Sequence, residues 1–181
     1  MNALGRACVF GYGSLVADGA GCVVAVLRGW RRCWGVAMDN RVDLPGYKSY
    51  RLRSDGSRPA VSVAFLDIVR DPSSAITGIC IPVDGRRLAE LDARERNYER
   101  LDVTSAVDGD HGTVWAYVGS GDGRARLHDG LGRGRAVVSR DYLAAAAAAV
   151  AALAPREAAA IGDAAEADGL AALDLERVEL A

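Results

Sequence analysis

Short apolar runs separated by glycine and polar clusters make up most of the chain before residue 140. Ala7–Phe10 is the first run, and Val23–Leu27 is a second run rich in β-branched residues. Gly29–Met38 continues it, and positions 30, 32, 34 and 36 would share one face of a strand. Because β-branched residues favour strands, we expect all three segments to be extended.

Residues 60–83 predict two more strands joined by a turn. An apolar, β-branched run covers residues 60–69, and a second run covers residues 75–83. Asp71–Ser74 between them has the Asp, Pro and Ser residues that favour turns, so we expect the two runs to pair with one another. Gly78 in the second run predicts a bulge or a close backbone contact.

Turn residues are dense in three other parts of the chain. Residues 101–107 and 113–118 predict a hairpin around the Gly- and Asp-rich residues 108–112. Residues 39–58 show no regular pattern, and residues 119–134 are rich in glycine and arginine. We therefore expect both of these segments to be irregular loops.

A short helix is predicted over residues 85–96. Asp84 is suited to cap its N-terminus. Leu88 and Leu91 recur at helical spacing and mark the face turned to the core. Glu95 falls on this same face, which makes it an unusual position for a carboxylate.

Alanine-rich helices are predicted at the C-terminal end of the chain. Ser139 caps a helix from Arg140 to about Leu153, which ends before Pro155. A last helical segment covers about residues 155–173, with glycines at 162 and 169 as potential breaks. These helices either pack on the core or form a homodimer interface.

The order of these elements indicates an α+β fold. Strands precede and follow single helices without the regular rhythm of a parallel sheet, so we expect a small mixed β-barrel flanked by helices. The 181 residues suffice for one domain with a full core. We assign residues 1–181 to a single domain, with a core over about 7–154 and a helical C-terminal extension over 155–181.

Composition and charge argue against several classes of protein. Hydrophobic residues make up 50% of the chain and charged residues 25%, and the formal net charge of −2 indicates neither a nucleic acid nor a membrane as partner. Residues 1–6 lack the apolar segment of a signal peptide. The longest apolar run, residues 143–154, is too short to span a bilayer. We therefore expect a cytoplasmic protein.

The most distinctive stretch is Val9–Leu15, where the first strand ends in a Gly-Tyr-Gly-Ser loop. Glycine lets a ligand approach the main chain, and successive N–H groups in such a turn form an anion site. Val16 stands where a dinucleotide fingerprint or a nucleophile elbow requires glycine, and no Gly-Lys-Ser/Thr follows. A carboxylate ligand is our hypothesis, and the alternative is a strand-end turn that binds nothing.

Glu95 is the strongest candidate for acid–base chemistry. A carboxylate on a core-facing helix face is costly to bury unless it is paired or used. A partly buried carboxyl group suits a base that must later act as an acid. The alternative is that Glu95 pairs with a neighbouring arginine at position 94, 96 or 100.

Other candidate groups carry weaker signals. A metal site is disfavoured because His111 and His128 lie in separate loops without further ligands at metal-binding spacing. The four cysteines form no Cys-x-x-Cys pair, and we interpret them as buried, reduced thiols rather than nucleophiles. Tyr47 and Tyr50 either line a substrate mouth or cover an edge of the core.

Six stretches of the chain form a recognisable set: Phe10–Leu15, Gly29–Trp34, Leu91–Glu95, Tyr98–Val103, Val114–Val118 and Tyr142-Leu143. Together they resemble the γ-glutamylcyclotransferase superfamily, which includes AIG2-like, γ-glutamylamine-specific and ChaC-like, glutathione-specific enzymes. The resemblance covers roughly residues 8–150. The two main motifs, the loop and the later helix–strand segment, occur in the family's order and spacing.

This resemblance implies an intramolecular reaction that needs no metal, cofactor or protein nucleophile. The free α-amine of a γ-glutamyl group attacks its own γ-carbonyl and releases 5-oxoproline with an amine, an amino acid or a peptide. Catalysis is then mainly the folding of the glutamyl arm into a reactive geometry. By resemblance, Glu95 takes the α-ammonium proton and returns it to the leaving amine, and Tyr117 contributes a hydroxyl. The implied carboxylate site is the backbone of Tyr12, Gly13, Ser14 and Leu15.

Two segments depart from the glutathione-specific pattern. Gly35–Arg41 replaces a Gln-x-Ser-x-Asp-His-Arg-like stretch, and Gly121–Arg124 replaces an Asn-Pro-x-Tyr segment. These departures count against glutathione, and they leave γ-glutamylamines, ε-(γ-glutamyl)lysine and biosynthetic γ-glutamyl intermediates open as substrates. The rival from another class is a non-catalytic protein of the same fold that binds an amino-acid-like ligand or a partner protein.

Overall fold

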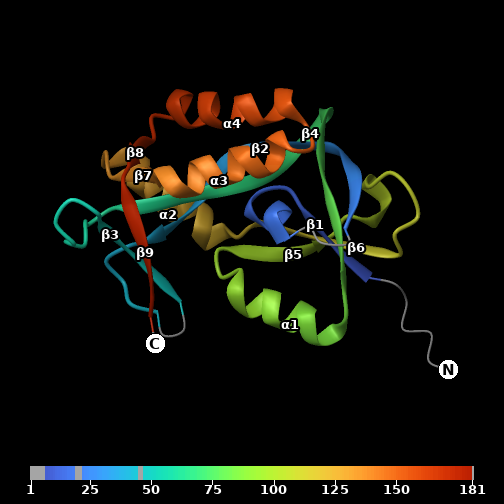
Figure 1. Ribbon diagram of the computed structural model, residues 1–181, viewed down its shortest axis with the longest axis horizontal. Helices are drawn as coiled ribbons and strands as arrows, with labels where there is room; N and C mark the ends of the chain where they lie inside the picture. Colours follow the sequence, from blue (N-terminus) through green and yellow to red (C-terminus); the bar gives the residue numbers. More distant parts are fainter. Residues whose placement is uncertain (1–6, 19–21, 45–46, 181) are drawn as a thin grey trace.

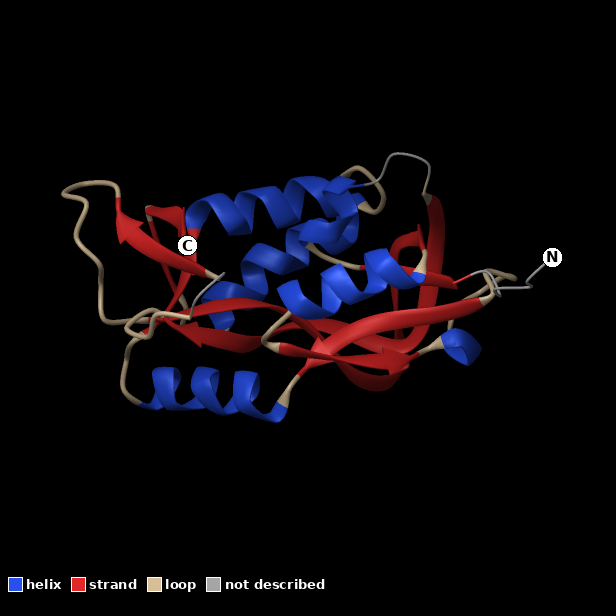
Figure 2. Cartoon of the chain, turned by 90° about the horizontal axis from the view of Figure 1, so that it is seen from below, coloured by secondary structure: helices blue, strands red, loops and turns tan. Residues whose placement is uncertain are grey.

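The computed structural model describes residues 7–18, 22–44 and 47–180, and within them the chain forms a large mixed sheet with helices on both faces (Figure 1, Figure 2). The strand order is β5-β6-β1-β4-β7-β8, with β2 paired to β4. The sheet consists of β1 (Ala7–Gly11), β2 (Val23–Asp39), β4 (Ser62–Val83), β5 (Tyr98–Asp102), β6 (Thr113–Gly119), β7 (Ala136–Ser139) and β8 (Ala171–Leu173). A separate ribbon pairs β3 (Lys48–Leu52) with β9 (Leu175–Glu179).

The helices pack in two places, with α3 and α4 side by side at the top of Figure 1 and α1 at the bottom. None of the helices in the described residues has the length and apolar character that a membrane span requires. The α-helices are α1 (Gly85–Arg94), α2 (Gly121–Gly132), α3 (Arg140–Ala151) and α4 (Pro155–Ala167), and the short 3-10 helices are η1 (Ser14–Asp18) and η2 (Thr104–Ala106).

The predicted α+β class with a mixed sheet flanked by helices is confirmed. Strand β1 lies between β4, to which it is antiparallel, and β6, to which it is parallel. The predicted cap of α1 is also confirmed, because the Asp84 side chain accepts a hydrogen bond from the backbone N–H of Arg87. Leu91 is buried, and Leu88 packs beside it. The predicted hairpin occurs as β5 and β6. Its first strand is shifted, because β5 spans Tyr98–Asp102 and most of the predicted strand over 101–107 is instead η2 and a loop.

The long antiparallel pair of β2 and β4 has two register shifts, one between Arg28 and Trp30 and one between Trp34 and Val36. An extra residue in one strand moves the side chains that follow to the opposite face. Trp30 and Trp34 therefore pack in the main core cluster, whereas Val36 packs in a second cluster. The prediction that these positions share a face is wrong at Val36 for this reason.

Strand β4 runs without interruption through residues 71–74, so the predicted turn and hairpin are wrong there. The register with β2 passes from Arg28–Ala75 to Trp30–Arg70, which leaves residues 71–74 as a bulge. Within it, Asp71 accepts hydrogen bonds from the hydroxyls of Ser73 and Ser74. The chain bends at this bulge instead of reversing (Figure 1), and both predicted runs pair with β2.

Most of the Gly- and Arg-rich segment 119–134 is the helix α2, which corrects the prediction of a loop. Ser120 caps it by accepting a hydrogen bond from the N–H of Gly123. A Cβ on Gly123 would lie 2.6 Å from the carbonyl oxygen of Asn97. The first turn of α2 therefore lies closer to Asn97 than a residue with a side chain at position 123 would allow. Tertiary packing therefore outweighs the low helix propensity of glycine.

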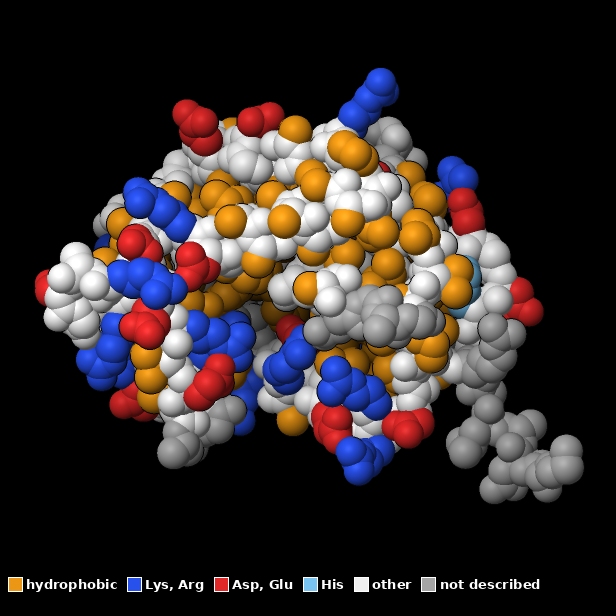
Figure 3. Space-filling view, in the orientation of Figure 1, with side chains coloured by type: hydrophobic (Ala, Val, Ile, Leu, Met, Phe, Trp, Pro, Cys, Tyr) orange, Lys and Arg blue, Asp and Glu red, His pale blue; other side chains and the backbone are white. Residues whose placement is uncertain are grey.

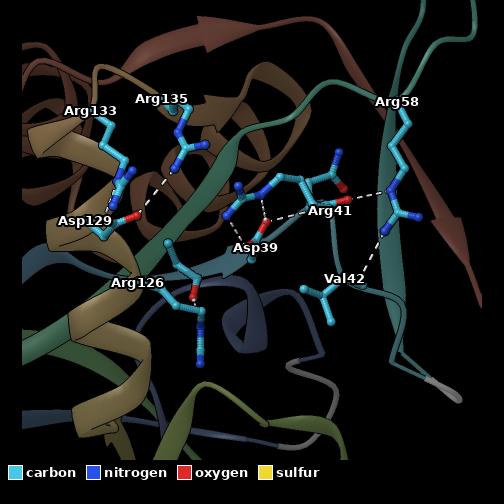
Figure 4. Close-up of polar contacts among 10 residues, drawn as sticks. Asp39, Arg41, Val42, Arg58, Arg126, Asp129, Arg133 and Arg135 are labelled. Carbon is cyan, nitrogen blue, oxygen red and sulfur yellow. Dashed lines mark hydrogen bonds and ion pairs between the residues drawn. The ribbon is translucent and has the colours of Figure 1, made fainter.

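The arginines of this region tie α2 to the end of β2 (Figure 4). The Arg126 guanidinium donates to the carbonyl oxygen of Ala37 at 2.8 Å. Arg133 and Arg135 both donate to Asp129. Nearby, Arg58 donates to the carbonyl oxygen of Val42 at 3.2 Å. Of these contacts, the one between Arg126 and Ala37 joins α2 directly to the sheet.

The C-terminal extension is helical only as far as Ala167, which corrects the helix expected over about 155–173 and the helical character expected of the extension 155–181. Beyond it, β8 pairs with β7 and β9 pairs with β3. The segment 39–58, expected to be irregular, supplies β3. Helices α3 and α4 bury Ala146, Val150 and Ile161 in the main core cluster.

Candidate functional site

The six residues predicted for the site line one small pocket of about 30 Å³. Its wall consists of Tyr12, Gly13, Ser14, Leu15, Glu95 and Tyr117, together with Leu66, Tyr98 and Tyr142. The loop after β1 and the C-terminal end of α1 thus face one another across the pocket. Residues 12–15, Glu95 and Tyr117 are far apart in the sequence and line the same pocket in the fold. The role of each residue stays a prediction.

The loop passes directly from β1 into η1, so its backbone amides lie at the start of a helical turn. The first N–H groups of a helix have no acceptor within it. Neither Gly11 nor Gly13 has a positive φ, so backbone strain is not the reason for these glycines. A Cβ on Gly11 would lie 3.1 Å from Cβ of Leu15, whereas a Cβ on Gly13 would meet Leu66 at 3.5 Å, an ordinary contact distance. Both glycines are buried, and Ser14 next to them is exposed.

The hydroxyls of the two predicted tyrosines make bonds within the protein. The hydroxyl of Tyr12 donates to the carbonyl oxygen of Tyr117 at 2.6 Å. The hydroxyl of Tyr117 donates to Asp92 Oδ1 at 2.7 Å. Burial, with Asp67 nearby, raises the pKa of Tyr12 well above its usual value. Both rings line the pocket, and both hydroxyls anchor its walls to neighbouring elements.

Glu95 caps the C-terminus of α1, where its backbone N–H donates to the carbonyl oxygen of Leu91 at 2.9 Å. Its side chain is 18% exposed, and Oε1 accepts a hydrogen bond from Arg94 Nε at 3.0 Å. The pairing with a neighbouring arginine, weighed above as the alternative, therefore occurs together with a position in the pocket. A partly exposed carboxylate beside a cation remains accessible to a ligand.

Two further tyrosines complete the pocket, and sequence reasoning did not single them out as site residues. The Tyr98 hydroxyl donates to the carbonyl oxygen of Leu66 at 2.6 Å, and the Tyr142 hydroxyl accepts from the backbone N–H of Leu66 at 3.3 Å. Burial raises the pKa of both tyrosines above the usual value. Both lie in stretches that carry the family resemblance, and that was the signal available in the sequence.

A larger cavity of about 480 Å³ adjoins this pocket and shares Ser14, Glu95, Tyr98 and Tyr142 with it. Figure 3 shows a hollow with basic side chains on both of its rims. The remaining lining residues come from the β3–β9 ribbon, from α1 and from neighbouring segments. They are Tyr47, Lys48, Phe65, Glu90, Ala93, Arg94, Arg96, Asn97, Arg177 and Glu179.

The ribbon side of the cavity was missed because neither β3 nor β9 was predicted. Tyr47 lines this cavity and is also buried in the second core cluster, so the structure fits both interpretations given above. Tyr50 lines a neighbouring cavity of about 230 Å³ and is also buried in the second core cluster. Among the described residues, no three or more His, Cys, Asp or Glu side chains form a group that could hold a metal ion.

A family model described as gamma-glutamyl cyclotransferase, AIG2-like, matches residues 9–143. The chain belongs to this family. All six predicted site residues and Lys48 lie within the part that matches the AIG2-like family. Arg177 and Glu179, on β9, lie outside residues 9–143. One wall of the cavity is therefore formed by a strand that the family model does not cover.

Solved structures of similar fold include proteins named as γ-glutamyl cyclotransferases. One is 12% identical over 87% of this chain and 86% of its own, with a TM-score of 0.52. A glutathione-specific enzyme from yeast is 15% identical over 67% of this chain and 72% of its own, with a TM-score of 0.44. A solution structure from Arabidopsis thaliana is 23% identical over 67% of this chain and 73% of its own, with a TM-score of 0.41. A search of curated proteins found no match.

Proposed function

We propose that this protein cleaves γ-glutamyl compounds by an intramolecular cyclisation that releases 5-oxoproline. The substrate α-nitrogen forms a bond to its own γ-carbonyl carbon, and the bond from that carbon to the leaving nitrogen breaks. The α-nitrogen loses two protons as it passes from an ammonium to a lactam N–H, and the leaving nitrogen gains two as it passes from an amide N–H to a free ammonium. One carboxylate that takes up and returns a proton in each transfer therefore suffices as proton carrier. The observation that supports this proposal most is the pocket shared by the Tyr12–Leu15 loop and Glu95.

The loop is the proposed site of the substrate α-carboxylate. Its amides lie at the start of η1, and Gly13 carries no side chain that would cover them. N–H donors that are fixed in place bind a carboxylate without reorganising. A carboxylate held there would position the neighbouring α-nitrogen over the γ-carbonyl, and such positioning is the main source of rate in an intramolecular reaction.

Glu95 is the proposed proton carrier. Its Oε1 already accepts a hydrogen bond from the Arg94 guanidinium, and the substrate α-ammonium would take an equivalent place. After attack, the same carboxyl group would return the proton to the leaving nitrogen. The larger cavity beside Glu95 offers room for the group that leaves.

Tyr98 and Tyr142 are proposed to shape the pocket rather than to transfer protons. Both bind the backbone of Leu66, one at its carbonyl oxygen and one at its N–H. Because burial raises their pKa values, both hydroxyls keep their protons at neutral pH. They therefore hold this segment of β4 against the loop and exclude water from the reacting atoms.

The test is a search for 5-oxoproline by mass spectrometry. The protein is incubated with γ-glutamyl amino acids, γ-glutamyl amines, ε-(γ-glutamyl)lysine and glutathione. We expect product from at least one donor and a loss of about 10²- to 10⁴-fold in Glu95→Gln. Glu99→Gln makes the same change at an exposed position outside the pocket, and we expect it to match the wild type.

Two results would contradict the proposal in different ways. No product from any donor would remove the enzyme assignment, and full activity in Glu95→Gln would remove Glu95 as the proton carrier. The Arg94–Glu95 pair also supports a second candidate, a non-catalytic binding protein, because a paired carboxylate can recognise a ligand ammonium without chemistry. In that case calorimetry would detect donor binding while 5-oxoproline stays absent.

A further inference from the structure

Lys48 is the only lysine of the chain, and it lies where two cavities meet. It belongs to β3 and lines both the 480 Å³ cavity and the neighbouring 230 Å³ cavity. Its Nζ lies 4.1 Å from the ring centroid of Phe65 and 5.3 Å from that of Tyr47. The ammonium group therefore rests on aromatic faces at the cavity wall, where water reaches it poorly.

The ammonium of Lys48 lacks a carboxylate partner among residues 7–18, 22–44 and 47–180. Its neighbours differ in this respect, since Arg94 pairs with Glu95 and Arg177 pairs with Glu179. Burial and, to a smaller extent, Arg177 lower the pKa of Lys48 to about 8, against the opposite effect of Glu95 and Glu179. Lys48 is half-buried, and a cation that is partly removed from water without an anionic partner is costly to the fold unless a ligand supplies the missing anion.

The cavity in front of Lys48 is continuous with the proposed reaction site. Glu95, Ser14 and Tyr142 line both the small pocket and this cavity. With the glutamyl carboxylate on the loop and the α-nitrogen at Glu95, the group on the far side of the γ-carbonyl must extend into the larger cavity. Lys48 lies on the wall that this leaving group would face.

We propose that Lys48 binds a carboxylate of the leaving group, so that the preferred substrates are γ-glutamyl amino acids or peptides rather than γ-glutamylamines. This inference rests on the proposed function and names the substrate class of the same site. In a γ-glutamyl amino acid, the leaving nitrogen is bonded to the carbon that bears the carboxylate. The anion is thus held close to the scissile bond, and binding it orients the leaving nitrogen for protonation by Glu95. A simple amine offers no anion for this cation.

The experiment compares two donors that differ only in this charge, γ-glutamylglycine and γ-glutamylglycine amide. The value of kcat/KM is measured for each from 5-oxoproline formation. We expect the wild type to prefer the dipeptide by about tenfold or more, which corresponds to one well-formed charge pair. Lys48→Met should abolish this preference, and Lys48→Arg should keep most of it.

Arg86→Met provides the matched control, because it removes a positive charge from the outer side of α1, where the side chain is 87% exposed. We expect the donor preference of this variant to equal that of the wild type. An equal fall of kcat/KM for both donors in Lys48→Met would overturn the inference, since Lys48 would then act on the glutamyl part that the two donors share. Equal use of both donors by the wild type would also overturn it, while the proposed function would stand.

Binding keeps the inference testable even if the protein forms no 5-oxoproline. The affinities of the same two donors for Glu95→Gln, and for Glu95→Gln combined with Lys48→Met, are measured by isothermal titration calorimetry. We expect tighter binding of the dipeptide only where Lys48 is present. Equal affinities in both variants would refute the role of Lys48 independently of turnover.

Discussion

The hydroxyl of Tyr117 donates a hydrogen bond to Asp92 Oδ1 at 2.7 Å and so joins strand β6 to the last turns of α1. Asp92 Oδ2 also accepts a hydrogen bond from Arg100 at 2.8 Å. These two contacts hold the end of the helix from which Glu95 projects. That Tyr117 contributes a hydroxyl to the pocket stays a prediction, and we propose that its contact with Asp92 also positions Glu95.

Tyr117→Phe tests this positioning role. We expect the free energy of unfolding to fall by about 1–2 kcal/mol, because a hydrogen bond to a charged acceptor is lost. The rate of 5-oxoproline formation should also fall, since Glu95 loses part of its support. Chemical denaturation and the 5-oxoproline assay measure the two effects. Tyr50→Phe is the control, because no described residue bonds to the Tyr50 hydroxyl, and an equal effect there would argue against the Tyr117–Asp92 contact.

Gly78→Ala should displace the end of β1 that leads into the loop. A Cβ at this position would lie 2.3 Å from the carbonyl oxygen of Gly11 and 2.6 Å from the ring of Phe10. The close contact predicted for Gly78 is therefore present, and we expect Gly78→Ala to cost about 2 kcal/mol or more. Gly162→Ala lies in open space within α4 and should instead stabilise by about 1 kcal/mol. Thermal unfolding of both variants checks these signs, and a neutral Gly78→Ala would contradict the packing described here.

Asp67 is a fully buried carboxylate whose removal should weaken the sheet. It accepts hydrogen bonds from the backbone N–H of Gly119 at 2.6 Å and from Arg124 at 3.0 Å. We expect Asp67→Asn to lower the free energy of unfolding by about 2–3 kcal/mol, because charge-assisted bonds are lost in the interior. Asp129→Asn removes an exposed partner of Arg133 and should cost less than about 1 kcal/mol. Urea denaturation that ranks the two variants in the opposite order would refute this account.

Leu175→Ala tests whether the C-terminal strand belongs to the core. Leu175 is 1% exposed and packs in the cluster that contains Tyr47, Tyr50 and Phe65 behind the cavity. We expect a loss of about 2–5 kcal/mol from the cavity left behind. Leu131→Ala, at a side chain that is 39% exposed, should have a much smaller effect. Similar unfolding curves for the two variants would mean that β9 is a dispensable extension.

The donor preference assigned to Lys48 should depend on pH. Its pKa is lowered to about 8, so the ammonium is mostly charged at pH 7 and mostly neutral at pH 9. We expect the ratio of kcat/KM for γ-glutamylglycine to that for its amide to fall as pH rises through 8. Both donors share the same α-amine, so its own titration cancels in the ratio. Lys48→Arg keeps its charge in this range and should show a flat ratio, and a flat ratio in the wild type would contradict the assignment.

Local patterns in the sequence determined the elements that carry the proposed chemistry. The apolar run that ends at Gly11 predicted β1 and its loop, and Asp84 with Leu88 and Leu91 predicted α1 and its buried face. These features depend on neighbours within a few residues, through capping, periodicity and turn preference. The same patterns placed Glu95 at the end of the helix.

Only the tertiary structure decided the larger cavity and the helix α2. Gly123 disfavours a helix on its own, and the packing of its turn on Asn97 overrides that preference. Lys48 gains its place because β3 pairs with β9, whose residues lie more than a hundred positions later in the chain. Such pairing depends on which strand edges and sheet faces remain free once the large sheet has formed. The hydrophobic periodicity within a short segment does not predict it. The sequence alone therefore predicted the loop and Glu95 on one side of the pocket, and long-range packing created the wall opposite them.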